Sequence, residues 1–245
     1  MPTMRYSIID TLRGLALCNM ILYHLFWDLT HLQGVELPWL DTVVGFVWQQ
    51  GICWTFILLA GFCQGLGQQQ LRRGLIVSIM GILVTIVTYL VGPDAPIVFG
   101  ILSFLGLAML LTTVLAPYLR RVSAGWGIGI NIFLFAATKL LNEGYLGFGN
   151  WRWYHLPSYF YEYGYFSSFW GFQAENFYSA DYFSLFPWWF LFLIGYYLEH
   201  LPLVSQALQR FSQGENKNLA WLGRHSLGVY LVHQPLIILV LRLYF

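Results

Sequence analysis

The sequence predicts an all-α protein: a polytopic integral membrane helical bundle of about seven transmembrane helices, with its N-terminus in the cytoplasm. Composition supports this first, because only 9% of the 245 residues are charged and 58% are hydrophobic, whereas roughly a quarter of a soluble domain is charged. Too few polar side chains remain to cover a water-facing surface, so lipid must contact much of it. The second observation is a series of apolar segments near the roughly 20 residues that cross a bilayer: 8–29, 43–65, 74–91, 98–117, 125–141, 182–198 and 226–243.

Short, turn-like connections join these segments, as at Gly92-Pro93-Asp94-Ala95-Pro96. No internal repeat or second soluble domain is visible in the sequence, so a single domain over residues 1–245 is expected. The cysteines Cys18, Cys53 and Cys63 lie in apolar runs without the spacing of metal ligands. Neither a metal nor a disulfide framework is therefore expected, and a net charge of +1 argues against a nucleic-acid surface.

The positions of lysine and arginine give the predicted orientation. With a cytoplasmic N-terminus, the inner ends and loops hold most of the basic residues, as the positive-inside rule expects: Arg5, Arg13, Arg72, Arg73, Arg120, Arg121, Arg210, Lys217 and Arg224. Lys139, Arg152 and Arg242 fall on the outer side. This imbalance predicts that the first segment runs outward and that the last segment ends outside.

Residues 142–183 differ from the rest of the chain, because they are dense in aromatic side chains but are interrupted by charges and by Pro157. They are too polar to be a plain span. One interpretation is an interfacial loop whose Tyr and Trp rings lie at the level of the lipid headgroups. The other is an outer lid whose rings stack on a sugar or another flat acceptor. The two interpretations are compatible.

The first segment carries ionisable residues where a bilayer makes them unfavourable, by about 2.5–3.5 kcal/mol each on insertion scales. Asp10, Arg13, His24, Asp28 and His31 recur at steps that place them on one helical face. Arg13 and His24 are separated by roughly 16 Å along the axis, so this stripe links the inner end to the outer half. Asp10 and Arg13 form either a structural pair or part of a site. His24 is either a hydrogen-bonded core histidine or a functional group, and its polar neighbours favour the second.

The last segment offers a matching set of polar residues. It enters the membrane with Arg224 and carries His233 shortly before Pro235. Proline lacks a backbone N–H, so a kink and a free carbonyl are expected nearby. His24 and His233 would lie at comparable depth if these two helices pack together.

Several motifs in order along nearly the whole chain carry a family resemblance. They are Ile9-Asp10-Thr11-Leu12-Arg13-Gly14-Leu15-Ala16-Leu17 with Tyr23-His24 and Trp27-Asp28-Leu29, then Leu59-Ala60-Gly61-Phe62, Ile97-Val98-Phe99-Gly100-Ile101-Leu102, Asp181-Tyr182-Phe183 with Phe186-Pro187-Trp188, and Gly223-Arg224-His225-Ser226-Leu227 with Tyr230-Leu231-Val232-His233-Gln234-Pro235. Together they resemble small bacterial proteins related to heparan-α-glucosaminide N-acetyltransferase. The spacing from Arg13 to His24 is similar to the first-helix motif of the wider transmembrane acyltransferases that modify envelope sugars. Ser103 departs from the family pattern, since a histidine is expected there.

The resemblance implies an acetyl-CoA-dependent acyltransferase of the bacterial inner membrane, which moves an acetyl group to an amine or hydroxyl of an extracytoplasmic sugar. His24 would be the general base, Asp28 would orient its ring or hold the acceptor, and His233 would be a second base or an oxyanion donor. Direct transfer and an acetyl-His24 intermediate both remain open. Asp181 and Trp188 would bind the acceptor. Guanidinium groups suit phosphate, so the residues expected to bind the cofactor, unless they serve topology alone, are Arg13 (supported by Asp10), Arg72, Arg73, Arg120 and Arg224.

Two other classes of protein fit the polar residues. A small proton-coupled transporter would use intramembrane His, Asp and Arg as relays, although no inverted repeat is visible. A non-catalytic scaffold would bind a partner through residues 142–183. Acetyl-CoA binding and transfer would indicate the enzyme, whereas ion-dependent uptake would indicate the carrier. Small-residue spacing such as Gly61 to Gly65 permits a homodimer or packing within one bundle.

Overall fold

The computed structural model describes residues 7–211 and 216–244, without the side chains of residues 205 and 209–211. Arg5 and the side chain of Arg210, both counted above on the inner side, lie outside this description. Regular structure in the described part is almost entirely helical, which confirms the predicted fold class. The main helices are α1 (Ser7–His31), α2 (Val43–Leu66), α3 (Gln70–Val91), α4 (Ile101–Leu119), α5 (Ala124–Thr138), α6 (Tyr165–Trp170), α7 (Trp188–Glu199), α8 (Pro202–Phe211), α9 (Lys217–Arg224) and α10 (Ser226–Tyr244).

The described chain divides into two compact units. Of the described residues, unit 1 contains 60–202, and unit 2 contains 7–59 together with 203–211 and 216–244. Unit 1 therefore holds α3 to α7 and the end of α2, and unit 2 holds α1, α9, α10 and the beginning of α2. Each unit is described by itself.

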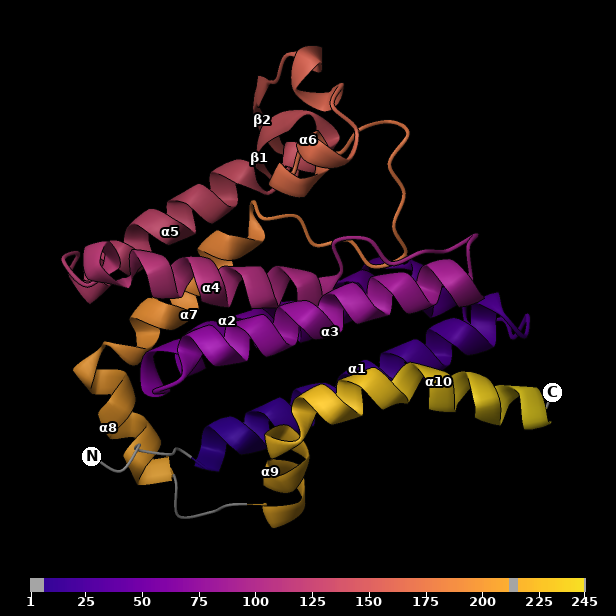
Figure 1. Cartoon of the computed structure of the whole chain (residues 1–245), viewed down its shortest axis with the longest axis horizontal. Coiled ribbons are helices and arrows are strands. Elements are labelled where there is room, and N and C mark those ends of the chain that lie inside the picture. The colour runs from indigo at the N-terminus through magenta and orange to yellow at the C-terminus, as the bar shows by residue number, and fades with distance from the viewer. Residues whose placement is uncertain (1–6, 212–215, 245) are drawn as a thin grey trace. The chain divides into compact units, whose positions relative to one another are not determined.

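In unit 2, α1 packs against both α9 and α10 (Figure 1). Glycines allow the backbones of α1 and α9 to approach closely, because a Cβ on Gly14 would overlap the carbonyl oxygen of Leu219. A Cβ on Gly223 would likewise overlap the carbonyl oxygen of Asp10. Since α9 lies against the beginning of α1 and leads directly into α10, α1 and α10 run parallel. Leu17, Met20 and Ile52 form the buried core beside them.

In unit 1, α3 and α4 lie side by side through small residues. A Cβ on Gly81 would overlap the backbone and hydroxyl of Ser103, and a Cβ on Gly106 would overlap Ser78. Such small-residue contacts are how membrane helices approach without a hydrophobic driving force between them. Ser103, where the family pattern predicts a histidine, therefore lies at the close contact with Gly81 of α3.

Six of the described helices are long and apolar enough to cross a membrane: α1, α2, α3, α4, α5 with the short 3-10 helix η2 (Leu141–Glu143), and α10. They correspond to six of the seven expected segments. The prediction of one continuous helix over 182–198 is wrong before Trp188, where α7 begins. Pro187 explains the late start, because it has no backbone N–H and disfavours the helical conformation of the preceding residue. α7 is therefore only about 18 Å long at ~1.5 Å per residue.

Residues 142–183 contain a small hairpin that was not predicted. Strands β1 (Tyr145–Phe148) and β2 (Trp151–His155) pair antiparallel at the end of α5 (Figure 1). Gly149 and Asn150 connect them, and Gly149 has a φ of 59°, which glycine adopts without strain. Beyond the hairpin lie the 3-10 helix η3 (Ser158–Tyr161) and α6. The Tyr161 hydroxyl donates to the Leu141 carbonyl at 2.7 Å, and burial raises the pKa of Tyr161 to about 12, so this hydroxyl stays a donor at neutral pH.

Candidate functional site

An imidazole pair lies between α1 and α10 within unit 2. The ring centroids of His24 and His233 are 5.0 Å apart, with the ring planes inclined at 53°. His24 is half-buried, and His233 is 8% exposed. His24 comes from α1 and His233 comes from α10. The two rings meet because the helices run parallel and pack together, which brings two segments that are distant in the sequence to the same depth.

A hydrogen bond beside the imidazoles joins the same two helices. Gln234 Nε2 donates to Asp28 Oδ2 at 2.8 Å, and Asp28 is 1% exposed. The Oε1 atom of Gln234 is buried and has no hydrogen-bond partner among the described residues. Gln234 was not predicted as a site residue. Gln234 directly follows His233 in the sequence, but its contact with Asp28 could not be predicted from the sequence, because it requires α10 to cover the polar face of α1.

The hydrogen bonding of His233 fixes which ring nitrogen carries the proton when the ring is neutral. Its Nδ1 lies against the carbonyl of Tyr230, and a carbonyl only accepts, so Nδ1 is the donor. Nε2 then holds the lone pair. This atom is buried and lacks a hydrogen-bond partner within the part of the chain that the structure describes. His233 is thus oriented as a proton acceptor at Nε2.

Replacing Asp28 by alanine is expected to destabilise the protein. The Gln234 amide would lose its acceptor in a buried position, which lowers the free energy of unfolding by about 1–3 kcal/mol. Asp28→Asn is the matched control, because its side-chain oxygen can still accept from Gln234. Thermal unfolding of the purified protein in detergent, followed by circular dichroism, measures both variants. Equal losses in the two variants would contradict this role of the bond.

Aromatic side chains surround the imidazole pair on the α1 side. The Tyr23 ring meets the His24 ring edge to face at 6.0 Å and the Trp48 ring at 5.4 Å. Trp48 in turn donates to Asn19 Oδ1 at 3.0 Å. His31, expected on the same stripe, is exposed and stacks on Trp27 at 4.0 Å. The stripe therefore holds for Asp10, His24 and Asp28 but not for its last member.

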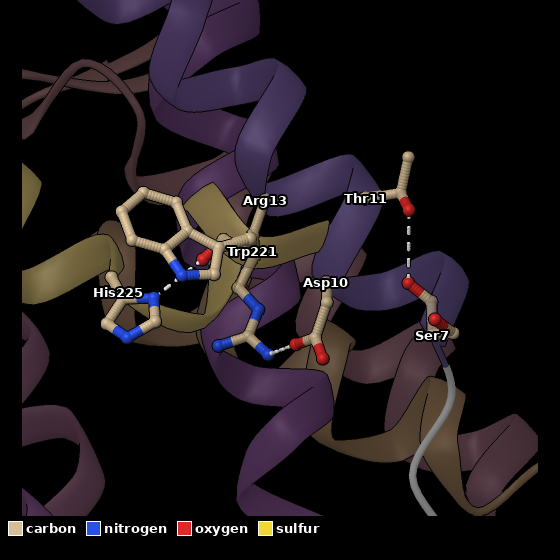
Figure 2. A network of polar contacts seen from close by, with 6 residues as sticks. All are labelled: Ser7, Asp10, Thr11, Arg13, Trp221 and His225. Carbon is tan, nitrogen blue, oxygen red and sulfur yellow. Dashed lines mark hydrogen bonds and ion pairs between the residues drawn. The ribbon is translucent and has the colours of Figure 1, made fainter. Parts of the chain in front are cut away.

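Asp10 and Arg13 form an ion pair near the start of α1 (Figure 2). The Arg13 Nη2 atom donates to the Asp10 carboxylate, and Asp10 is 1% exposed. The same view labels Trp221 of α9 and His225, which directly follows α9, with His225 Nδ1 at 2.8 Å from the Trp221 carbonyl. Asp10 thus partly neutralises Arg13 at the contact between α1 and α9.

The other arginines expected to bind the cofactor are exposed at helix ends. Arg224 ends α9 in unit 2, directly after Gly223. Arg72 and Arg73 lie in the first turn of α3, and Arg120 caps the end of α4, all in unit 1. Arg72 contacts Gln69 Oε1 at 3.3 Å. Their guanidinium groups are accessible to an anion, as phosphate binding requires.

Asp181 and Trp188, the residues expected to bind the acceptor, make contacts within unit 1. Asp181 Oδ2 accepts from the backbone N–H of Ile101 at 3.0 Å, and so satisfies one of the free donors that begin α4. Trp188 is buried, and the Lys139 ammonium lies 4.1 Å from its ring centroid. Both residues therefore stabilise local structure in unit 1.

The fold and the site define a multi-pass helical membrane protein that holds an imidazole pair and a carboxylate between two of its spans. A family model described as heparan-alpha-glucosaminide N-acetyltransferase, catalytic, matches residues 5–235. The chain belongs to this family, which supports a membrane acyltransferase-type function of the N-acetyltransferase kind. No curated protein and no solved structure matched the chain.

Proposed function

We propose that the protein transfers an acetyl group from cytoplasmic acetyl-CoA to an amine or hydroxyl of an extracytoplasmic sugar. The observation that carries the proposal is the imidazole pair of His24 and His233, together with the buried Asp28 carboxylate that accepts from Gln234, the residue after His233. Family membership supports an acyl-CoA donor and a saccharide acceptor. The cytoplasmic side of the donor follows from the predicted orientation of α1, in which basic residues lie inside.

The transfer needs a base and a leaving group. The acceptor nitrogen or oxygen attacks the thioester carbonyl, a new bond forms to the acetyl carbon, and the carbon–sulfur bond breaks. A histidine takes the proton of the acceptor and returns it to the CoA thiolate. His24 is the proposed base, and His233, with Nε2 unprotonated in its neutral form, is the second acceptor for that proton.

Binding of the cofactor is assigned to the exposed arginines at helix ends. Guanidinium forks pair with phosphate oxygens, and Arg72, Arg73, Arg120 and Arg224 are accessible for this role. Arg13 is already paired with Asp10, so the two are assigned to supporting the inner end of α1. Asp28 is assigned to hold the acceptor or to orient His24.

The test uses purified full-length protein in liposomes, radiolabelled acetyl-CoA and a panel of amino sugars. We expect labelled sugar with the wild-type protein and none above background with His24→Ala. His200→Ala is the control, because His200 is an exposed histidine of unit 1 that contacts Glu199 and the Tyr196 carbonyl. Its activity should equal that of the wild type.

Three results would overturn the proposal. The first is a folded protein that neither binds acetyl-CoA nor labels any sugar. The second is His24→Ala with full activity. The third is ion-dependent uptake of a solute into the liposomes without acetyl transfer, which would identify a carrier.

A further inference from the structure

The β1–β2 hairpin has one apolar face and one polar face. Residues paired directly across an antiparallel ladder point to the same side of it. The register therefore places on one face Leu146, Phe148, Trp151 and Tyr154, and on the opposite face Tyr145, Arg152 and His155. The hairpin is thus amphipathic, although it has only two strands.

The apolar face is largely uncovered by the described protein. Trp151 is 77% exposed and Tyr154 is 59% exposed. On the polar face, Arg152 pairs with Glu143 at 3.4 Å, and its guanidinium carbon lies 4.5 Å from the Tyr145 ring centroid. Exposed aromatic surface of this kind, bordered by charge, marks a site of interaction.

The neighbouring helix indicates what covers this face. The register skips Trp153, which is the extra residue of a β-bulge. Its ring stacks on Phe133 of α5 at 6.3 Å, with the ring planes inclined at 19°. Phe133, Ile130 and Trp126 are spaced at helical steps on α5 and are all exposed, so they form the lipid-facing side of a candidate span. The Trp153 ring therefore extends the lipid-facing surface of α5 beyond the end of that helix.

We infer that the hairpin is a membrane anchor, with its apolar face in the headgroup layer beside α5 and its polar face towards water. Phe133 lies about 8 Å from the end of α5, at ~1.5 Å per residue, which places the hairpin at the bilayer surface. Tyr and Trp are the side chains enriched at that depth, because each ring combines an apolar body with a polar tip. The partner of this face is therefore lipid.

Depth-dependent quenching tests the anchor in the full chain. A variant with Cys18, Cys53 and Cys63 replaced by alanine receives one new cysteine, either Trp151→Cys or its matched neighbour Arg152→Cys on the opposite face. An environment-sensitive fluorophore is attached, and the protein is placed in phosphatidylcholine–phosphatidylglycerol vesicles. Both substituted side chains are exposed, so size-exclusion chromatography should show folded, monodisperse protein.

We expect a lipid with a nitroxide near its headgroup to quench the label at position 151, and aqueous iodide to quench the label at position 152. Equal iodide quenching at both positions would overturn the inference. So would protection of position 151 by a soluble amino-sugar oligomer, or fluorescence transfer between labelled copies at that position, since these identify a sugar or a second chain as the partner.

Discussion

Replacing His233 by alanine is expected to lower the rate of acetyl transfer by about 10²–10⁴-fold, the range that a positioned general base contributes. His233 is the best-oriented acceptor in unit 2, because its Nδ1 is committed to the Tyr230 carbonyl and its Nε2 is left unprotonated. The rate is measured with saturating acetyl-CoA and the best acceptor from the sugar panel. His233→Asn should lose as much activity as His233→Ala. The asparagine amide can still donate to a nearby carbonyl, but it cannot accept a proton as imidazole does.

The double variant of His24 and His233 distinguishes a working pair from two separate groups. Residues that act as a unit are strongly non-additive, so removing both rings should cost little more than removing the more important one. Additive losses would contradict a shared role. Incubation with labelled acetyl-CoA alone, followed by rapid denaturation, shows whether an acetyl group remains on the chain. Loss of that label in His24→Ala would favour the acetyl-histidine route over direct transfer.

Gly223→Ala is expected to destabilise the protein. The added Cβ would overlap the Asp10 carbonyl oxygen and would lie against the Gly14 backbone, so α9 would have to move away from α1. Overpacking of this kind typically costs about 1–3 kcal/mol, and the loss should appear as a lower Tm in detergent.

Gly228→Ala is the matched control for Gly223, because no atom lies near the Cβ that it would add. Alanine is favoured over glycine within a helix by roughly 0.5–1 kcal/mol, so this variant should be as stable as the wild type or more stable. A Gly223→Ala protein with unchanged Tm would contradict the close contact between α1 and α9.

Much of the fold follows from properties that are local in sequence. Apolar length alone predicts the spans, because each must match the thickness of the bilayer. Helical periodicity correctly predicts that Asp10 and Asp28 share a buried face of α1. His31 fails the same prediction because it lies in the last turn, where the exposed Trp27 ring offers it a stacking partner.

The remainder depends on contacts between distant segments. The polar stripe on α1 shows that a partner helix covers it, but only the packed structure shows that α10 supplies His233 and Gln234. The hairpin escaped prediction for another reason: the aromatic runs on either side of Gly149-Asn150 are short. A glycine-containing pair between such runs is nonetheless a recognised hairpin signal. The motif around Asp181 alone led to the prediction that this residue binds the acceptor. The motif could not show its hydrogen bond to the Ile101 N–H, because α4 is far away in the sequence.

The parallel arrangement of α1 and α10 constrains how often the chain crosses the bilayer. If α1 to α5 each cross once, the chain leaves α5 on the side opposite to its start, whereas α9 returns it to the starting side before α10. One more passage must therefore lie between Thr138 and Lys217.

α7 and the segment before it are suited to that passage. Phe183, Ser184 and Leu185 are buried, and non-helical backbone is tolerated at membrane depth where protein covers it. Residues 185–187 turn into α7, because the Trp189 N–H donates to the Leu185 carbonyl and Pro187 has helical φ and ψ angles. α7 itself supplies about 18 Å of the passage at ~1.5 Å per residue. A crossing that is only partly helical would be enclosed by protein and would be missed by any criterion based on apolar helix length.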